Sequence, residues 1–218
     1  MSIRLVSWLK PRALLISSVI LLGGCTQYGT QPPQVKSVVN PTVKQSSWEQ
    51  RQAYLARRQN WSLGSKISLR YGDENYIFGL SWAQQNANQY TMQITHPLTG
   101  ALVAKLSRQS GGVTLLADNG RTYRDTDEER LLQNQSGVRI PVKGMQYWVR
   151  GMTSPEYKVD QLILDNLGRP ETLYQAGWKV SYSNYTNNST QAMPRRVVLT
   201  RSKDKLYIKL IAKTWQGV

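Results

Sequence analysis

The chain has 218 residues, with 28 lysines and arginines against 13 acidic residues, and it contains one cysteine. This length suits a single domain that buries a core, and one cysteine excludes an internal disulfide framework. The formal net charge of +15 is typical of chains that meet nucleic acid, an anionic membrane or an acidic protein, although a solvated surface gives the same balance.

Residues 1–24 predict a secretory signal peptide. Arg4, Lys10 and Arg12 precede an apolar run over residues 13–22, which is shorter than the about 20 residues that a membrane-spanning helix needs. The run ends at Leu22-Gly23-Gly24-Cys25. This ending resembles the bacterial lipobox, in which the cysteine receives a diacylglycerol thioether and an N-acyl chain. We therefore expect Cys25 to be lipidated; the alternative is a chance thiol beside a simple cleavage site.

The residue after the cysteine bears on location. In lipoprotein sorting of the enterobacterial kind, an aspartate there retains the protein in the inner membrane, whereas this chain has Thr26. We therefore expect a lipid-anchored protein on the periplasmic side of the outer membrane of a Gram-negative bacterium. Export excludes nucleic acid as a partner. The mature chain, with a net charge of +12, is left with anionic lipid or an acidic protein.

Residues 25–46 predict a lipidated N-terminus followed by a flexible tether, because three prolines interrupt a stretch without apolar periodicity. Residues 47–218 form one expected folded domain, in which no internal repeat is visible. Its first element is a predicted helix, in which Ser47 and Gln50 match a capping box before Trp48, Tyr54, Leu55 and Trp61.

Alternating apolar and polar residues then predict half-buried antiparallel strands. The clearest are residues 63–71 and 76–82, joined by a Gly72-Asp73 turn, and residues 90–94, 178–182 and 206–210. Further hairpin turns are expected at residues 111–112 and 119–120. The whole pattern predicts about eleven strands.

Two short helices interrupt these strands. Thr126 and Glu129 match a capping box, and apolar residues between Val142 and Met152 form a helical stripe after Pro141. The predicted fold class is therefore α+β, with a strongly curved antiparallel sheet and a few short helices laid over one face.

Catalytic chemistry has little support in the sequence. The single histidine, His96, stands in a turn before Pro97, so a Ser-His or Cys-His centre would depend on it alone. The sequence shows no metal-ligand spacing and no Gly-rich phosphate loop. We expect no enzyme, no metal and no cofactor beyond the lipid on Cys25. Four acidic residues lie close together in the sequence and could form an acid–base group: Asp125, Asp127, Glu128 and Glu129. Their place at the start of a predicted helix already explains them, because the helix dipole favours carboxylates there.

Large apolar side chains on one face of a curved sheet predict an interior cavity that could hold acyl chains. An ordinary packed core has the same pattern. Strand parity, which a one-residue register error would invert, selects as the lining set Ile67, Leu69, Phe78, Leu80, Trp82, Met92, Ile94, Trp148 and Val180.

A series of short motifs, taken in order and spacing, is similar to the LolB family of outer-membrane lipoprotein receptors over almost all of the mature chain. The motifs are residues 82–85 (WAQQ), 96–100 (HPLTG), 119–123 (NGRTY), 140–141 (IP), 146–151 (QYWVRG), 177–182 (GWKVSY), 192–194 (AMP), 199–200 (LT), 208–210 (IKL) and Trp215. The chain departs from the commoner loop at His96, where the family has Asn, and at Thr99-Gly100. The apolar tip of that loop is unchanged.

The resemblance implies an unclosed half β-barrel, capped by helices, with an apolar interior. It also implies that the protein, as a monomer, accepts triacylated lipoproteins from the related periplasmic carrier LolA and inserts them into the inner leaflet of the outer membrane without nucleotide. The partners would be LolA, client lipoproteins and outer-membrane phospholipid. The loop that holds Pro97 and Leu98 would act in delivery to the membrane.

Basic residues are expected to speed the encounter with the carrier or with lipid headgroups, among them Arg51, Arg57, Arg58, Arg195 and Arg196. Two alternatives stay open. One is a structural or peptidoglycan-associated envelope lipoprotein with a fully packed core. The other is a hydrolase, which would need His96 buried beside a serine and an acid.

Overall fold

The computed structural model of the protein describes residues 40–218, so the predicted signal peptide, Cys25 and most of the predicted tether lie outside the described residues. The described chain forms, in order, α1 (Pro41–Ala56), β1 (Trp61–Tyr71), β2 (Glu74–Asn86), β3 (Gln89–Thr95), β4 (Leu102–Gln109), β5 (Gly112–Ala117), β6 (Thr122–Asp125), α2 (Glu128–Ser136), α3 (Val142–Trp148), β7 (Val159–Leu164), β8 (Pro170–Gln175), β9 (Trp178–Tyr185), β10 (Pro194–Arg201), a 3-10 turn (Ser202–Asp204) and β11 (Leu206–Gln216).

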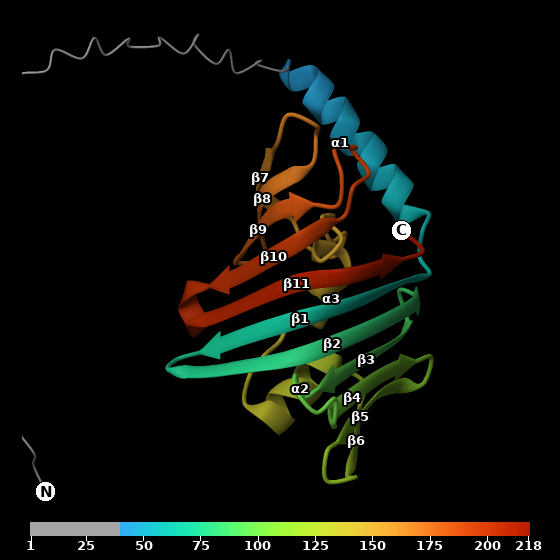
Figure 1. Ribbon diagram of the computed structural model, residues 1–218, viewed down its shortest axis with the longest axis vertical. Helices are drawn as coiled ribbons and strands as arrows, with labels where there is room; N and C mark the ends of the chain where they lie inside the picture. Colours follow the sequence, from blue (N-terminus) through green and yellow to red (C-terminus); the bar gives the residue numbers. More distant parts are fainter. Residues whose placement is uncertain (1–39) are drawn as a thin grey trace, which may run out of the picture. The chain divides into compact units, whose positions relative to one another are not determined.

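The eleven strands form one antiparallel sheet in the order β6-β5-β4-β3-β2-β1-β11-β10-β9-β8-β7. The first and last strands lie side by side at its centre (Figure 1). The two edge strands, β6 and β7, do not pair with each other, so the sheet is not closed. This confirms the predicted fold class, an α+β protein with an unclosed antiparallel sheet of eleven strands.

The sheet has an inner and an outer face, because successive side chains along a strand point to opposite sides. On the inner face, apolar residues lie opposite one another across neighbouring strands, for example Leu80 with Ile94 and Trp82 with Met92. Residues of α2 and α3 complete this apolar cluster. Both helices lie behind the sheet in Figure 1, so the face turned toward the viewer is the outer face.

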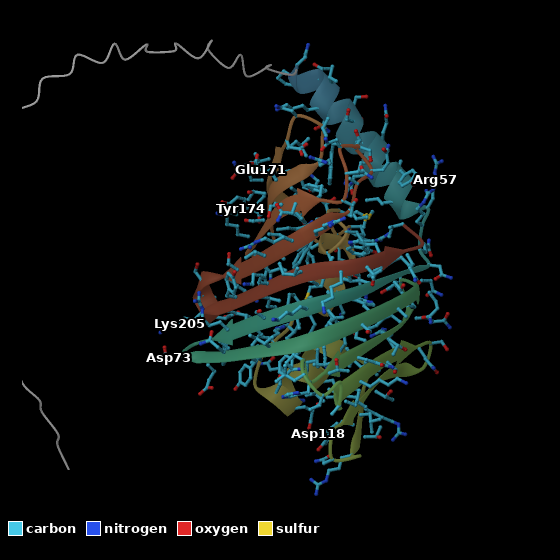
Figure 2. The ribbon with its side chains drawn as sticks, viewed as in Figure 1. Arg57, Asp73, Asp118, Glu171, Tyr174 and Lys205 are labelled. Carbon is cyan, nitrogen blue, oxygen red and sulfur yellow. The ribbon has the colours of Figure 1, made fainter. Side chains whose placement is uncertain are left out.

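The two ends of the sheet also differ. Turns alternate between the ends of an antiparallel sheet, so the β1–β2, β3–β4 and β10–β11 turns lie together at what we call the hairpin end. Asp73 and Lys205 mark this end in Figure 2. At the opposite end, called the α1 end, α1 finishes near Arg57 and β1 begins.

Helix α1 begins at Pro41, six residues before the predicted start at Ser47. Asn40 is the N-cap, with its side chain accepting a hydrogen bond from the Thr42 amide at 2.9 Å, and proline is well suited to the first helical position. Residues 41–46, assigned to the tether from the sequence, are therefore helical. Trp61, assigned to the helix, is instead the first residue of β1.

Helices α2 and α3 lie where the sequence predicts them, with different ends. The N-cap of α2 is Asp127 rather than Thr126, and Gly137 ends the helix in the left-handed conformation at φ 74°. Helix α3 stops at Trp148, although the apolar stripe continues to Met152. No helix within residues 40–218 has the length and hydropathy needed to span a bilayer.

Candidate functional site

The inner face of the sheet is largely apolar and contains eight of the nine residues of the predicted lining set. Strand register places Ile67 opposite Phe78 and Val180 opposite Leu199. Eight of the nine come from the sheet, and Trp148 comes from α3 on the opposite side of the cluster. The parity argument therefore selected one face correctly. A role of these residues in binding acyl chains stays a prediction.

Side chains of the two helices fill the space over this face. Trp148 is fully buried, and its indole Nε1 donates a hydrogen bond to Gln175 Oε1 at 2.7 Å. Gly144 lies so close to the Trp148 ring that a Cβ there would collide with a ring carbon. The buried Trp148 side chain occupies part of the space over the inner face in which the sequence predicted an acyl cavity.

On β1, β2 and β3, burial along the inner face weakens toward the hairpin end, whereas Leu206 of β11 stays buried there. Trp82 and Val180 are almost completely buried, whereas Leu69, Phe78 and Ile94 are only half-buried at the edge of the cluster. Tyr76 stacks on Phe78 with ring centroids 6.1 Å apart and is 44 % exposed. The apolar interior is therefore most accessible at the hairpin end of β1, β2 and β3.

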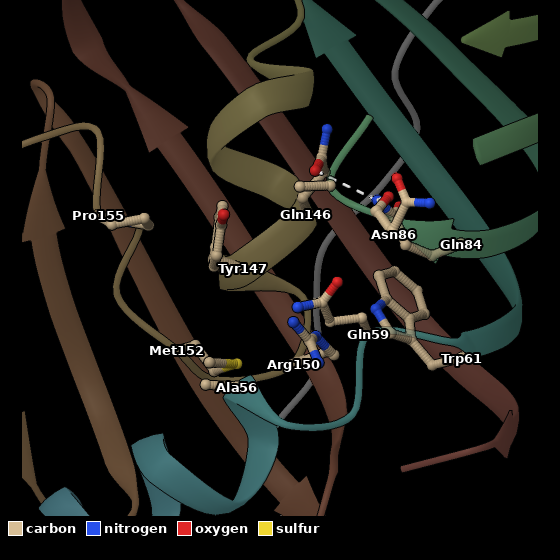
Figure 3. A pocket seen from close by; sticks show the side chains of 11 residues that line it. Ala56, Gln59, Trp61, Gln84, Asn86, Gln146, Tyr147, Arg150, Met152 and Pro155 are labelled. Carbon is tan, nitrogen blue, oxygen red and sulfur yellow. Dashed lines mark hydrogen bonds between the residues drawn. The ribbon is translucent and has the colours of Figure 1, made fainter. Parts of the chain in front are cut away.

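A pocket of about 260 Å³ lies at the α1 end (Figure 3). Gln84 and Gln146 meet across it, with Gln84 Nε2 donating to Gln146 Oε1 at 3.3 Å. None of the nine predicted interior residues lines it; the lining residues are Ala56, Gln59, Trp61, Gln84, Asn86, Ala87, Gln146, Tyr147, Arg150, Met152 and Pro155. The mixture of amides with apolar side chains suits a small amphipathic group better than an alkyl chain.

Arg150 lines this pocket and also fastens the end of α1. Its guanidinium donates to the carbonyl oxygens of Leu55 and Arg58, at 3.1 and 2.9 Å, and lies over the Trp61 ring at 5.2 Å. The partial negative charge at a helix C-terminus favours a cation at this position. Burial, together with the nearby positive charge of Arg51, lowers the pKa of Arg150 to about 10.

Arg51 is the second buried arginine and lies inside the protein rather than on its surface. It donates to the carbonyl oxygens of Arg150, Gly151, Thr190 and Ala192 at 2.6–3.3 Å. Burial lowers its pKa. The expectation that Arg51 steers a partner is therefore wrong, because no partner can reach it. Arg57, Arg195 and Arg196 are exposed, and Arg58 is half-buried over the Tyr54 ring.

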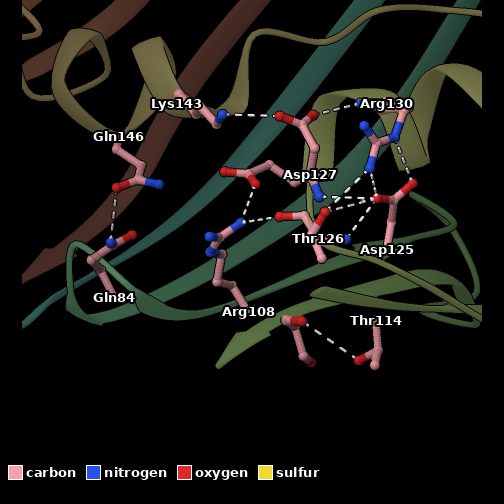
Figure 4. A network of polar contacts seen from close by, with 11 residues as sticks. Gln84, Arg108, Thr114, Asp125, Thr126, Asp127, Arg130, Lys143 and Gln146 are labelled. Carbon is pink, nitrogen blue, oxygen red and sulfur yellow. Dashed lines mark hydrogen bonds and ion pairs between the residues drawn. The ribbon is translucent and has the colours of Figure 1, made fainter. Parts of the chain in front are cut away.

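The acidic residues around the start of α2 form a network of ion pairs (Figure 4). Asp127 accepts from the Arg130 amide at 2.8 Å and from Lys143 Nζ at 2.9 Å. The other acids of the group are paired as well, in the pairs Asp125–Arg130, Glu128–Arg108 and Glu129–Arg139. The Arg130 guanidinium lowers the pKa of Asp125, whereas burial raises the pKa of Glu129. These contacts join α2 to β4, β6 and α3, and explain the four carboxylates without an acid–base reaction.

The loop between β3 and β4 presents Leu98 at its tip, 90 % exposed. His96 builds the loop, because its amide donates to Ala101 O at 2.8 Å and its Nδ1 faces the amides of Leu98 and Thr99 at 3.4 Å. Gly100 completes the turn with φ 72°. Pro97 is exposed beside Leu98. The sequence placed both residues at this tip, and their role at a membrane stays a prediction.

The hydrolase alternative fails at the same loop. It needed His96 buried beside a serine and an acid, and the structure places His96 exposed in a turn. Among the described residues, no group of three or more His, Cys, Asp or Glu side chains could hold a metal ion.

Sequence reasoning did not identify the Gln84–Gln146 pair or the two buried arginines. A signal for Arg51 was present, since Trp48, Arg51 and Leu55 lie three and four residues apart and share the buried face of α1. A charged residue on such a stripe marks a buried, hydrogen-bonded group. For the glutamine pair, which joins residues 62 apart in the chain, the sequence holds no comparable signal.

The family model described as "Outer membrane lipoprotein LolB" matches residues 59–215. Among curated relatives named outer-membrane lipoprotein LolB, the protein of Chromohalobacter salexigens is 33% identical over 198 residues (91% of this chain, 86% of the relative), and one from Pseudomonas putida is 30% identical over 203 residues (93% and 94%).

Two solved structures are also similar. A LolA superfamily protein from Nitrosomonas europaea has a TM-score of 0.48 at 10% identity, covering 80% of this chain and 93% of that one. A putative outer membrane lipoprotein-sorting protein domain from Vibrio parahaemolyticus has a TM-score of 0.47 at 11% identity, covering 78% and 90%. On the sequence matches, which span most of its length, the chain belongs to the LolB family of outer-membrane lipoproteins.

Proposed function

We propose that this protein accepts triacylated lipoproteins from the soluble periplasmic carrier LolA and inserts them into the inner leaflet of the outer membrane, to which it is anchored through a lipid on Cys25. The family assigns the chain a role in outer-membrane lipoprotein localisation. The observation that carries the finer proposal is an unclosed sheet whose inner face is largely apolar and is covered, among the described residues, by two short helices and the segments that flank them.

The physical need for such a face follows from the client. Each methylene removed from water contributes about 0.8 kcal/mol, so three exposed acyl chains would cost on the order of 30 kcal/mol. In this structure the helices occupy the face, and client chains would have to replace their side chains. That exchange swaps one apolar contact for another. Helices of nine and seven residues are small enough to be displaced while the sheet stays intact.

Transfer would require no nucleotide, because lipoproteins can pass down a gradient of affinity from carrier to receptor to bilayer. The half-buried residues at the hairpin end, Leu69, Phe78 and Ile94, supply the entrance. The exposed Leu98 lies at the same end of the sheet. The entrance to the interior and the exposed tip at Leu98 are thus neighbours. This arrangement suits the delivery of acyl chains to the bilayer without their passage through water.

The second candidate, a structural or peptidoglycan-associated envelope lipoprotein, has one observation in its favour. It requires a packed core, and Trp148 and its neighbours fill the interior. The two functions differ in one measurable property, because only a receptor takes up a lipoprotein.

The test is a transfer assay with the mature chain, residues 25–218, carrying Cys25→Ala so that it stays out of membranes. LolA preloaded with a fluorescently labelled lipoprotein is mixed with this chain without nucleotide, and the label is followed by size separation. Movement of the label to the chain supports the proposal. If the label stays on the carrier while the chain is folded by circular dichroism, the receptor function is rejected.

A further inference from the structure

The outer face of the sheet carries an uneven distribution of charge. Strands β1, β9, β10 and β11 contain no aspartate or glutamate. Their outward positions hold several cations, and we call the five that lie in the regular strand register the outer cationic patch: Lys66, Arg70, Lys179, Arg196 and Lys209. None of the five forms a salt bridge within residues 40–218.

Strand register brings the five cations together. Ile211 pairs with Lys66 on one side and with Arg196 on the other, while Lys209 lies one outward position further along β11. With strands about 4.8 Å apart and about 3.3 Å between residues, neighbouring cations of the patch stand roughly 8–12 Å apart. That spacing is comparable to the screening length at physiological salt, about 8 Å, so the charges act together on a nearby surface.

Most acidic side chains lie elsewhere, although Asp160 lines a surface pocket together with Lys179 of the patch. The four around the start of α2 are paired with cations of β4, α2 and α3 and of the segment between the two helices. The acids closest along the chain to the patch, Asp73 and Glu74, lie in the β1–β2 turn and at the first position of β2. An ordinary solvated surface mixes the two signs. A face of one sign, built from neighbouring strands, instead favours a polyanionic partner.

Exposed apolar residues adjoin the patch at the hairpin end. Ile77 is 48 % exposed and pairs with Ser68, between Lys66 and Arg70 of the neighbouring strand. Leu102 of β4 is 37 % exposed and pairs with Thr95 of β3. The same row of the sheet continues from Thr95 to Gly79 of β2 and then to Lys66 of β1. Together with Leu98, these residues form an apolar edge next to the cations.

We propose that this outer surface at the hairpin end binds a bilayer containing anionic phospholipid, with Ile77, Leu98 and Leu102 at the acyl boundary and the outer cationic patch on the headgroup phosphates. The combination of apolar tips with surrounding lysines and arginines is that of proteins that bind at a membrane interface. The inference rests on the proposed function, which it deepens by naming the lipid class and the surface that meets it. Because Asp73 and Glu74 repel the phosphates, the sheet lies with its outer face toward the lipids rather than standing on the β1–β2 turn.

The test uses the mature chain with Cys25→Ala, because the lipid anchor would hide the effect. Binding is measured by co-sedimentation with phosphatidylcholine vesicles, with and without phosphatidylglycerol. The patch variant carries Lys66→Gln, Arg70→Gln and Lys209→Gln. The matched control carries Lys44→Gln, Arg57→Gln and Lys158→Gln, which remove the same charge from α1 and from the loop before β7. Circular dichroism checks that both are folded.

We expect the parent to bind the phosphatidylglycerol vesicles more tightly, and added salt to weaken that binding. The patch variant should bind them at least about 10-fold more weakly, and the control should change by less than about 2-fold. Equal binding to both vesicle types, an unchanged patch variant, or an equal loss in the control would each overturn the proposal. A patch variant that binds vesicles normally yet receives lipoprotein slowly from LolA would assign the patch to an acidic protein instead. Neither client nor carrier is present in the vesicle assay, so its outcome is independent of the receptor function.

Discussion

Gln175 holds Trp148 in place, because its Oε1 accepts the indole hydrogen bond at 2.7 Å and joins α3 to β8. The side-chain amide of Gln175 makes three further hydrogen bonds. Its Oε1 also accepts from the backbone amide of Ser154 at 3.0 Å, and its Nε2 donates to the carbonyl oxygens of Ser154 and Tyr157 at 2.8 and 2.7 Å. Gln175 is fully buried. One side chain thus fixes both the helix that fills the interior and the segment that follows it.

Replacing Gln175 with leucine should lower the free energy of unfolding by about 2–4 kcal/mol, since the buried polar groups of Trp148, Ser154 and Tyr157 would lose their partner. Urea denaturation followed by tryptophan fluorescence measures the change. Gln161→Leu, on the exposed edge strand β7, is the control and should shift the value by less than about 0.5 kcal/mol. A loss below about 1 kcal/mol for Gln175→Leu would show that other contacts hold α3.

Arg51→Met should destabilise the protein by about 3 kcal/mol or more, because four buried carbonyl oxygens lose a charged donor and α1 loses its attachment to residues 150–151 and 190–192. Arg57→Gln removes the same charge from the exposed end of the same helix and should change stability by less than about 0.5 kcal/mol. Thermal and urea unfolding separate the two. Similar effects of both variants would mean that charge, rather than the buried contacts, decides stability.

The contrast between the inner face and α1 shows what could be predicted from this sequence. Strand parity is a local property, and it placed Leu80, Ile94 and Val180 on the correct face. The start of α1 was missed because residues 41–47 are not buried, so no apolar periodicity marks them, and Ser47 is as good a cap in isolation as Asn40.

The filling of the interior also could not be predicted. Whether a curved sheet encloses empty space depends on how closely α3 approaches it, and the hydrogen bond between Trp148 and Gln175 of β8 fixes that approach. Arg51 likewise bonds to carbonyl groups 99 to 141 residues away in the chain. Contacts of this range leave no trace in local spacing.

Stability should fall in acid through the network at α2. The Arg130 guanidinium lowers the pKa of Asp125, and hydrogen bonds from Arg130 and Lys143 lower that of Asp127 against the opposing effect of burial. Both groups therefore add stability above their unfolded pKa of about 4, and that stability is lost as pH falls through the folded values. Glu129, with its pKa raised by burial, has the opposite effect and reduces the net loss.

The measurement is the urea midpoint at a series of pH values between about 6 and about 2.5. The parent midpoint should decline over the lower half of that range, and the Asp125→Asn, Asp127→Asn variant should decline less. Parallel curves for the two proteins would show that carboxylates outside this network cause the acid sensitivity.

Ile94→Glu should weaken the acceptance of lipoprotein from the carrier much more than Gln93→Glu. The two residues are neighbours on β3, but Ile94 faces the apolar interior at the hairpin end and Gln93 lies exposed on the outer face. A carboxylate on the inner face would have to be buried against acyl chains, which costs several kcal/mol. Because Ile94 is half-buried, the variant should still fold, as near-UV circular dichroism will show. Equal transfer by both variants would place the acyl chains elsewhere.

Leu98→Glu should leave the fold and the acceptance step nearly unchanged but slow the insertion of lipoprotein into liposomes by about 10-fold or more. Leu98 is 90 % exposed, so its replacement removes no core contact, and the His96 and Gly100 contacts that build the loop involve backbone amides. An apolar tip can enter the acyl boundary, whereas a carboxylate there must stay in water or be desolvated.

Ser110→Glu adds the same charge to the turn at the other end of β4 and should slow neither step. The two steps are measured on the same preparations, first from carrier to receptor and then from receptor to liposomes. If Leu98→Glu slows both steps equally, or slows neither, Leu98 does not act as a membrane-insertion tip.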